Sequence, residues 1–175
     1  MSNVIIMDKN YLNEDALENV ISYALRVDND ELNNTSFSVY WDGSGVLVSS
    51  PNSSIESFKV VKRLYNRNGG NLLHHIIITI DEKSLSSNEA FSIARNICNN
   101  IGFEILSNGF QNITFIHHTV HSTHIHLIIN SINYHNGNRI SSTGWLGNTI
   151  MLYLRKEFYD LTWEYNPIYK KGSFQ

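Results

Sequence analysis

Hydrophobic residues alternate with polar ones, or form short unbroken runs, in several segments of the chain. Side chains on a strand point to opposite faces in turn, so these patterns are typical of β-strands. Strands are expected at residues 4–7, 37–41, 72–80, 113–120 and 125–133. Val46 and Val48 alternate again after residues 42–45, which predicts a hairpin or a strand followed by a loop.

Apolar residues recur at helical spacing between these strands. Helices are expected at about residues 12–27, 55–66, 88–101 and 147–161. Ser54 is the candidate N-cap of the second helix, because a serine hydroxyl can accept a hydrogen bond from a free backbone amide there. Gly102 is expected to end the third helix, since glycine tolerates the left-handed conformation common at that position.

The order of these elements predicts an α+β fold. The last two strands have a short connection, which only an antiparallel pair allows, so the central sheet is expected to be mainly antiparallel with helices packed on one face. No repeat or linker interrupts the pattern. Residues 1–175 are therefore expected to form a single domain.

Composition narrows the class of protein. The longest apolar runs are of strand length, so no membrane span is expected. The N-terminus has no basic segment followed by a long apolar one, and Cys98 is the single cysteine, which together favour the cytoplasm. The net charge of −3 argues against indiscriminate nucleic-acid binding, so any DNA contact must rest on local patches or on a metal.

Residues 117–130 carry the densest candidate chemistry, with five of the eight histidines. His124 and His126 are two positions apart and alternate with aliphatic residues, so both imidazoles are expected on one face of a strand and the aliphatic side chains on the other. One face is suited to a core and the other to chemistry.

Imidazole is a good ligand for divalent transition metals, and His124 and His126 supply two. His117 ends the preceding strand, and a short turn brings it beside them as a third. Three protein ligands leave coordination positions for a substrate oxygen and water. The alternative interpretation is a chance cluster of histidines on a sheet surface.

Other candidate groups are fewer. The chain has no nucleophile elbow, P-loop or dinucleotide-binding glycine pattern, and Cys98 falls on a buried helix face. A tyrosine can attack a phosphodiester if a metal polarises the phosphate and a base accepts the phenol proton. One face of the second helix carries cations whose default role is solvation and whose alternative role is contact with phosphates, namely Lys59, Lys62, Arg63 and Arg67.

The histidine spacing resembles the third motif of the HUH endonucleases, and in particular of the MobA/VirD2-like relaxases that nick one DNA strand at a transfer origin. His117, His124, His126 and Asn130 match that motif, and Arg139 matches a basic residue after the following turn. Thr119 stands where the family usually has an aspartate. The looser upstream motifs are matched by Tyr23, late in the first helix, and by residues 73–80, which include His75.

The resemblance implies a role for each matched residue. His117, His124 and His126 would hold Mg²⁺ or Mn²⁺, with Asn130 and His75 in support. Tyr23 would be the nucleophile, with Tyr11 and Tyr153 as reserves, and His121 or His118 the base. Contacts to DNA would come from the five cations Lys59, Lys62, Arg63, Arg67 and Arg139. For His74 and His75 a structural role at the strand end is the alternative, and for Arg139 a plain surface charge.

The implied activity is nicking and rejoining of single-stranded origin-of-transfer DNA through a covalent 5′-phosphotyrosine. The implied partners are that DNA, accessory relaxosome proteins and a coupling protein. The alternatives are a rolling-circle initiator or HUH transposase, in which the tyrosine follows the histidines, a non-catalytic DNA-binding accessory domain, and a metal-dependent hydrolase of small molecules. Thr119 and the acidic balance are the features that favour the accessory domain.

Overall fold

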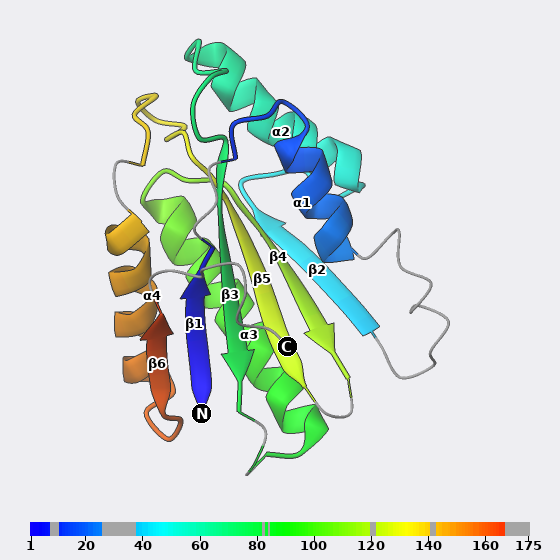
Figure 1. The fold of residues 1–175 in the computed structure, drawn as a ribbon, viewed down its shortest axis with the longest axis vertical. Coiled ribbons are helices and arrows are strands. Elements are labelled where there is room, and N and C mark those ends of the chain that lie inside the picture. The colour runs from blue at the N-terminus through cyan, green and yellow to red at the C-terminus, as the bar shows by residue number, and fades with distance from the viewer. Residues whose placement is uncertain are drawn as a thin grey trace.

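Six strands form one sheet, as the computed structural model of residues 1–7, 11–25, 38–81, 83, 85–119, 122–140 and 143–166 shows (Figure 1). The strands are β1 (Ser2–Ile6), β2 (Ser38–Ser44), β3 (Leu73–Ile80), β4 (Asn112–His118), β5 (Thr123–Asn130) and β6 (Trp163–Asn166). Their order is β2-β4-β5-β3-β1-β6. Only β1 and β6 pair in parallel, so the expected mainly antiparallel α+β fold is confirmed.

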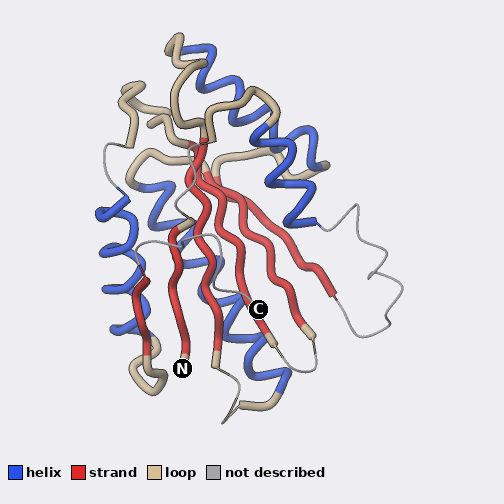
Figure 2. The backbone as a smooth tube through the Cα atoms, in the orientation of Figure 1, coloured by secondary structure: helices blue, strands red, loops and turns tan. Residues whose placement is uncertain are grey.

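The helices cover both faces of the sheet, so the expectation that they pack on one face is wrong. They are α1 (Ala16–Leu25), α2 (Pro51–Leu64), α3 (Ser87–Ser107) and α4 (Thr143–Glu157). In Figures 1 and 2, α1 lies in front of the strands with α2 beside it at the upper end of the sheet, and α3 lies behind the strands. The central strands carry apolar side chains on both faces of the sheet, and each apolar face must be buried by helices.

Each face has its own core. On the side of α3 and α4, the strands contribute Ile76 and Ile78 from β3 and Ile125, Leu127 and Ile129 from β5. On the side of α1 and α2, Leu73, Ile113, Phe115 and Ile128 pack with buried residues of the two helices. The histidines of β5 share this second side, because His124, His126 and Ile128 alternate with the isoleucines of the first core.

The helix starts are set by serine caps. Ser50 is the N-cap of α2, where its hydroxyl accepts a hydrogen bond from the Ser53 amide and Pro51 takes the first helical position. The predicted cap, Ser54, is instead buried inside the helix. Ser86 caps α3 in the same way, and the Glu89 carboxylate accepts a hydrogen bond from the Ser86 amide.

Gly102 does not end α3, which continues to Ser107. It is buried, and a side chain there would meet Asn112 and Ser44. The Gly102 carbonyl accepts a hydrogen bond of 2.8 Å from the Asn112 side chain. The glycine therefore allows a close approach of α3 to β2 and β4 rather than a turn.

The segment after β2 and the C-terminal elements α4 and β6 differ most from expectation. The segment around Val46 and Val48 forms no strand, so β2 is followed by a loop. Strand β6, whose four residues follow α4, was not predicted. Helix α4 begins at Thr143 and ends at Glu157, four residues earlier at each end than expected. No helix in the described part of the chain is long and apolar enough to cross a membrane.

Candidate metal centre

Three histidines meet on the α1 and α2 side of the sheet. His117 on β4 faces His124 on β5 across the antiparallel ladder, and His126 follows on the same face of β5. One ligand nitrogen from each of the three lies within 4.8 Å of the others. His117 and His126 are buried and His124 is partly exposed, so the cluster opens to solvent on the side of His124.

The nitrogen positions suit one ion. His117 Nδ1 and His124 Nε2 are 3.1 Å apart. Two nitrogens bound to one divalent ion at about 2.0–2.1 Å lie about 3 Å from each other when their bonds are roughly at right angles or tetrahedral. A donor set of three imidazoles also suits a divalent transition metal. The three-histidine cluster thus fits a metal site.

His117 is held from behind by helix α1. Its Nε2–H donates a hydrogen bond to the backbone carbonyl of Ala24. A carbonyl oxygen can only accept a hydrogen bond, so the histidine nitrogen is the donor. This bond places the proton on Nε2 and leaves the Nδ1 lone pair directed at the cluster, as a metal ligand requires.

His126 is held by a second histidine. His126 Nδ1 and His75 Nε2 are 2.9 Å apart, and their rings stack with centroids 5.1 Å apart. On the far side of His75, its Nδ1 lies 3.4 Å from the hydroxyl of Tyr11. A ligand histidine is usually oriented by a group at its other nitrogen, and His75 occupies that position for His126.

Tyr23 lies beside the cluster at the end of α1. Its ring centroid is 5.7 Å from that of His126, in an edge-on arrangement. The side chain is 61% exposed, so a polymeric substrate can reach it. The structure therefore brings together Tyr23 and all three predicted metal ligands.

The two reserve tyrosines occupy different surroundings. Tyr11 is buried, and burial, with a smaller effect from Tyr23, raises its pKa to about 12. Tyr153 is on α4 and packs against the core on the opposite side of the sheet from the histidines. Of the three tyrosines, Tyr23 alone combines exposure with a place beside the cluster.

His118, which follows His117 on β4, does not join the cluster. His118 faces α3, where its Nε2 lies 2.9 Å from the Ser87 hydroxyl and its Nδ1 lies 2.8 Å from the Thr123 hydroxyl. His121, the predicted base, lies outside the described residues. The Thr119 hydroxyl hydrogen-bonds with Ser122, including the Ser122 amide at 3.0 Å, and so closes the turn between β4 and β5.

Asn130 lies at the other end of β5 from the histidines and is fully buried. Its side-chain oxygen accepts a hydrogen bond of 2.8 Å from the Lys62 ammonium. Its amide donates one of 2.8 Å to Gln111 and a longer one to the Phe58 carbonyl. The structure therefore does not bring Asn130 to the metal ligands but joins it to helix α2.

Lys62 is a buried cation rather than a surface one. Only 4% of the residue is exposed, and burial, followed by repulsion from Arg139 and Lys59, lowers its pKa to about 7. The usual lysine value is 10.5, so the unfolded chain binds more protons than the folded one between pH 7 and 10.5. The stability cost of this lysine is therefore complete below about pH 7 and declines as the pH rises toward 10.5.

We expect Lys62→Met to raise the free energy of unfolding by about 1–3 kcal/mol at pH 6–7, because it removes a buried charge at the cost of one partner of Asn130. The gain should shrink as the pH rises toward 10. Urea unfolding at pH 6, 8 and 10 measures it. Lys59→Met on the same helix, where the lysine is more exposed, should change stability by less than about 1 kcal/mol. A gain for Lys62→Met that does not vary with pH would contradict the assignment.

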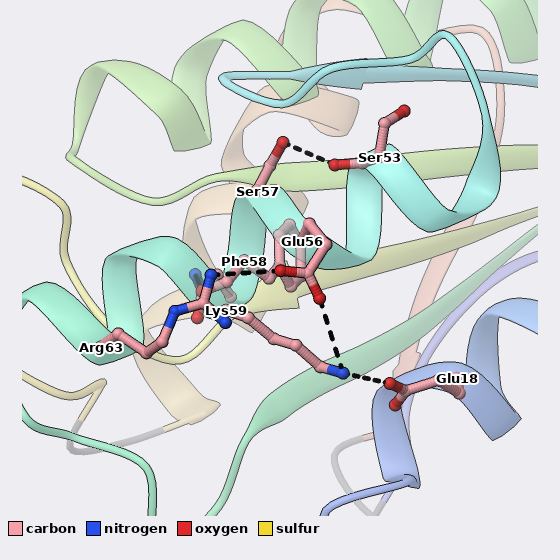
Figure 3. A network of polar contacts seen from close by, with 8 residues as sticks. Glu18, Ser53, Glu56, Ser57, Phe58, Lys59 and Arg63 are labelled. Atoms are coloured by element: carbon pink, nitrogen blue, oxygen red, sulfur yellow. Dashed lines mark hydrogen bonds and ion pairs between the residues drawn. The ribbon is translucent and has the colours of Figure 1, made fainter.

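The neighbouring cations of α2 are paired with carboxylates (Figure 3). Lys59 forms an ion pair with Glu18 of α1 and lies 3.9 Å from Glu56. Arg63 lies 3.1 Å from Glu56 on the exposed side of the helix. Arg67 follows the end of α2 and is exposed. The predicted cationic face is thus divided between ion pairs, one buried lysine and one exposed arginine.

Arg139 holds a loop together. Its guanidinium donates hydrogen bonds to the backbone carbonyls of Asn71 and Gly69, and one of 3.2 Å to the Ser131 hydroxyl. These contacts join the segment after β5 to the segment before β3. In the structure, Arg139 therefore stabilises the packing of these two segments against each other.

Two functional neighbours were missed by the sequence reasoning. The Ala24 carbonyl carries no side-chain signal, so only the placement of α1 could reveal it. Tyr11 was considered only as a nucleophile, yet its hydroxyl lies behind His75. Leu73, His75 and Ile77 are two positions apart on β3 and therefore share the face of the sheet that carries the histidine cluster. This alternation was the one signal in the sequence that placed His75, and with it the Tyr11 hydroxyl behind it, near the cluster.

Comparison with known protein families gives one match. The relaxase family "MobA/VirD2-like, nuclease domain" matches residues 26–156, which include all three histidines of the cluster but not Tyr23. Searches of curated proteins and of solved structures give no match. The match spans more than half of the chain and confirms the resemblance seen in the histidine motif. The chain therefore belongs to the MobA/VirD2-like family of relaxase nuclease domains.

Proposed function

We propose that this protein is a metal-dependent DNA relaxase that nicks and rejoins single-stranded DNA at a transfer origin through a tyrosine. The observation that carries the proposal is the meeting of four side chains: three histidine nitrogens within 4.8 Å of one another, and the exposed Tyr23 next to His126. The family membership supports nicking of DNA as the activity.

The metal would be held by His117 Nδ1, His124 Nε2 and His126 Nε2. In His117 and His126 the other ring nitrogen is already hydrogen-bonded, to Ala24 and to His75 respectively. In His124 the Nε2 atom is the one that faces His117. A bound Mg²⁺ or Mn²⁺ ion would supply positive charge that stabilises the negative phosphate oxygens in the transition state. A histidine binds a metal only as the neutral imidazole, and these hydrogen bonds leave one ring nitrogen of His117 and one of His126 for the ion.

Tyr23 would attack the phosphorus of one phosphodiester. The new bond joins the phenol oxygen to the 5′-phosphate, the bond to the 3′ oxygen breaks, and the 3′ oxygen receives a proton and leaves as a hydroxyl. The same hydroxyl, or that of another strand, can reverse the step, so the phosphodiester energy is conserved. His121 stays the predicted base for the phenol proton.

The test is capture of the covalent adduct. The protein is incubated with Mn²⁺ and a library of single-stranded oligonucleotides that carry a randomised 30-nucleotide segment, labelled at either end. Attachment to the 5′-phosphate predicts that the 3′ label migrates with the protein on a denaturing gel and that the 5′ label does not. EDTA should abolish the adduct, and sequencing the captured DNA would identify the recognised origin.

The other outcomes separate the rival functions. An adduct that maps to Tyr153 would indicate the chemistry of a rolling-circle initiator or a transposase. Metal binding without any cleavage would indicate an accessory DNA-binding domain. Hydrolysis of small phosphodiesters without a protein–DNA adduct would indicate a metal-dependent hydrolase. Each of these results would overturn the proposal.

We expect His75→Ala to weaken Mn²⁺ binding by about 10–100-fold, because His126 would lose the group that orients it. His75→Gln should recover part of the affinity, since a side-chain carbonyl can still accept from His126 Nδ1–H. Titration calorimetry with Mn²⁺ measures both variants. The control is His74→Ala, which changes the adjacent histidine on the other side of β3 and should keep the affinity. Equal losses for His74→Ala and His75→Ala would contradict a positioning role.

A further inference from the structure

A pocket of about 300 Å³ lies between the start of α1, helix α2 and the segment before β3. It is lined by Glu14, Leu17, Lys59, Lys62, Arg63, Asn68 and Leu72. None of these residues belongs to the histidine cluster. Pockets of this size accept a small flat group rather than a whole ligand of drug size.

Lys62 gives the pocket an unusual polar group. Among the residues that the structure describes, the Asn130 side-chain oxygen is the one hydrogen-bond acceptor for its ammonium. An ammonium has three donors, and a buried donor without an acceptor is unfavourable. A pocket ligand with acceptor atoms on its edge would satisfy the remaining donors. The cost of keeping a lysine at this buried position is consistent with a role in binding.

The charges around the pocket argue against a phosphate group as its occupant. Lys59 is paired with Glu18 and Glu56, and Arg63 with Glu56, so these two cations are already neutralised. A third carboxylate, that of Glu14, also lines the pocket. Leu17 and Leu72 add apolar walls. A pocket with both apolar walls and hydrogen-bond donors fits a nucleobase, which has flat apolar faces and a hydrogen-bonding edge.

The position along α1 places such a base near the proposed nick. Leu17 precedes Tyr23 by six residues on the same helix, a rise of about 9 Å. At about 3.4 Å per nucleotide of a stacked strand, this distance corresponds to two or three nucleotides. A strand bound at Tyr23 can therefore reach the pocket with a neighbouring base.

We propose that this pocket binds one unstacked guanine of the DNA strand and that Lys62 donates to the O6 and N7 atoms of the base. Lysine recognises guanine through these two acceptors, whereas adenine presents an amino group at the position of O6. The inference rests on the proposed function, which supplies single-stranded DNA as the ligand. It adds a base preference that the metal and Tyr23 do not provide.

The experiment measures binding without cleavage. Fluorescence anisotropy in EDTA compares 15-nucleotide oligothymidylates whose central position is guanine, hypoxanthine, 7-deazaguanine, adenine or an abasic site. The oligonucleotides with guanine and with hypoxanthine should bind equally, and about 5–100-fold more tightly than the one with adenine, because a good base contact discriminates to this extent. The affinity for 7-deazaguanine, which keeps O6 but lacks N7, should lie between those for guanine and adenine. Equal affinity for guanine and the abasic site would mean that the pocket takes only the backbone and would overturn the proposal.

Lys62→Met should reduce the preference for guanine over adenine to less than about twofold, while its raised melting temperature shows that it is folded. Lys156→Met changes an exposed lysine of α4 and should keep the preference. A guanine preference that survives in Lys62→Met would also overturn the proposal. Because no metal or cleavage is involved, failure here leaves the adduct test intact. A guanine preference without an adduct would instead reject the nickase and keep the pocket.

Discussion

Tyr23→Phe is expected to lower covalent adduct formation by at least about 1,000-fold, because it removes the oxygen that would bond to phosphorus and leaves the ring in place. The side chain is largely exposed, so the variant should fold as the wild type does. The measurement is the amount of 3′-labelled DNA that stays with the protein under denaturing conditions, with Mn²⁺ affinity followed in parallel.

Tyr11→Phe and Tyr153→Phe are the matched controls for this change. Tyr153→Phe removes one phenol oxygen from the opposite side of the sheet and should keep full adduct formation. Tyr11→Phe removes the contact to His75 and should reduce the rate without abolishing the adduct. An adduct that persists in Tyr23→Phe and is lost in either control would show that another tyrosine is the nucleophile.

His124→Ala is expected to weaken Mn²⁺ binding by at least about 100-fold and to abolish the adduct. It removes one of three ligands and leaves two imidazoles, which hold a divalent ion far less tightly. His124 is the most exposed of the three ligands, so its loss should disturb the core least. Calorimetry with Mn²⁺ gives the affinity, and circular dichroism shows whether the fold is kept.

His118→Ala is the matched control for His124→Ala. It removes a histidine from the same pair of strands, one whose ring faces α3 instead of the cluster. The variant should bind Mn²⁺ as the wild type does. If His124→Ala keeps wild-type affinity, or if His118→Ala loses it as severely, the metal site lies elsewhere.

Local sequence patterns predicted most of the sheet because side-chain alternation is a local property. The alternation of His124, Ile125, His126 and Leu127 was enough to place the imidazoles and the aliphatic side chains on opposite faces, and the structure confirms both. The pairing of His117 with His124 followed from the short turn between two strands. These are interactions between near neighbours in the sequence.

The features that were missed depend on contacts between distant residues. Helices cover both faces of the sheet because α1 and α2 pack on the face opposite α3 and α4. Helical periodicity in the sequence predicts a helix but not the face of the sheet on which it packs. Glycine is common at helix ends, but Gly102 lies inside α3, where the lack of a side chain leaves room for Asn112. Lys62 was assigned to a cationic surface by its spacing, whereas packing against β5 buries it next to Asn130. In each case tertiary packing overrides a local preference.

The hydrogen bond from His117 to Ala24 joins a predicted metal ligand to the residue that directly follows Tyr23. Binding of an ion at the proposed site would therefore be thermodynamically linked to the order of the last turn of α1, since an ion that fixes the His117 ring would also favour the helix end that accepts its hydrogen bond. Such coupling is reciprocal. DNA that immobilises Tyr23 should increase the affinity for the ion by the same factor by which the ion increases the affinity for DNA. The proposed relaxase would then assemble its catalytic centre fully only when the ion and the strand are present together.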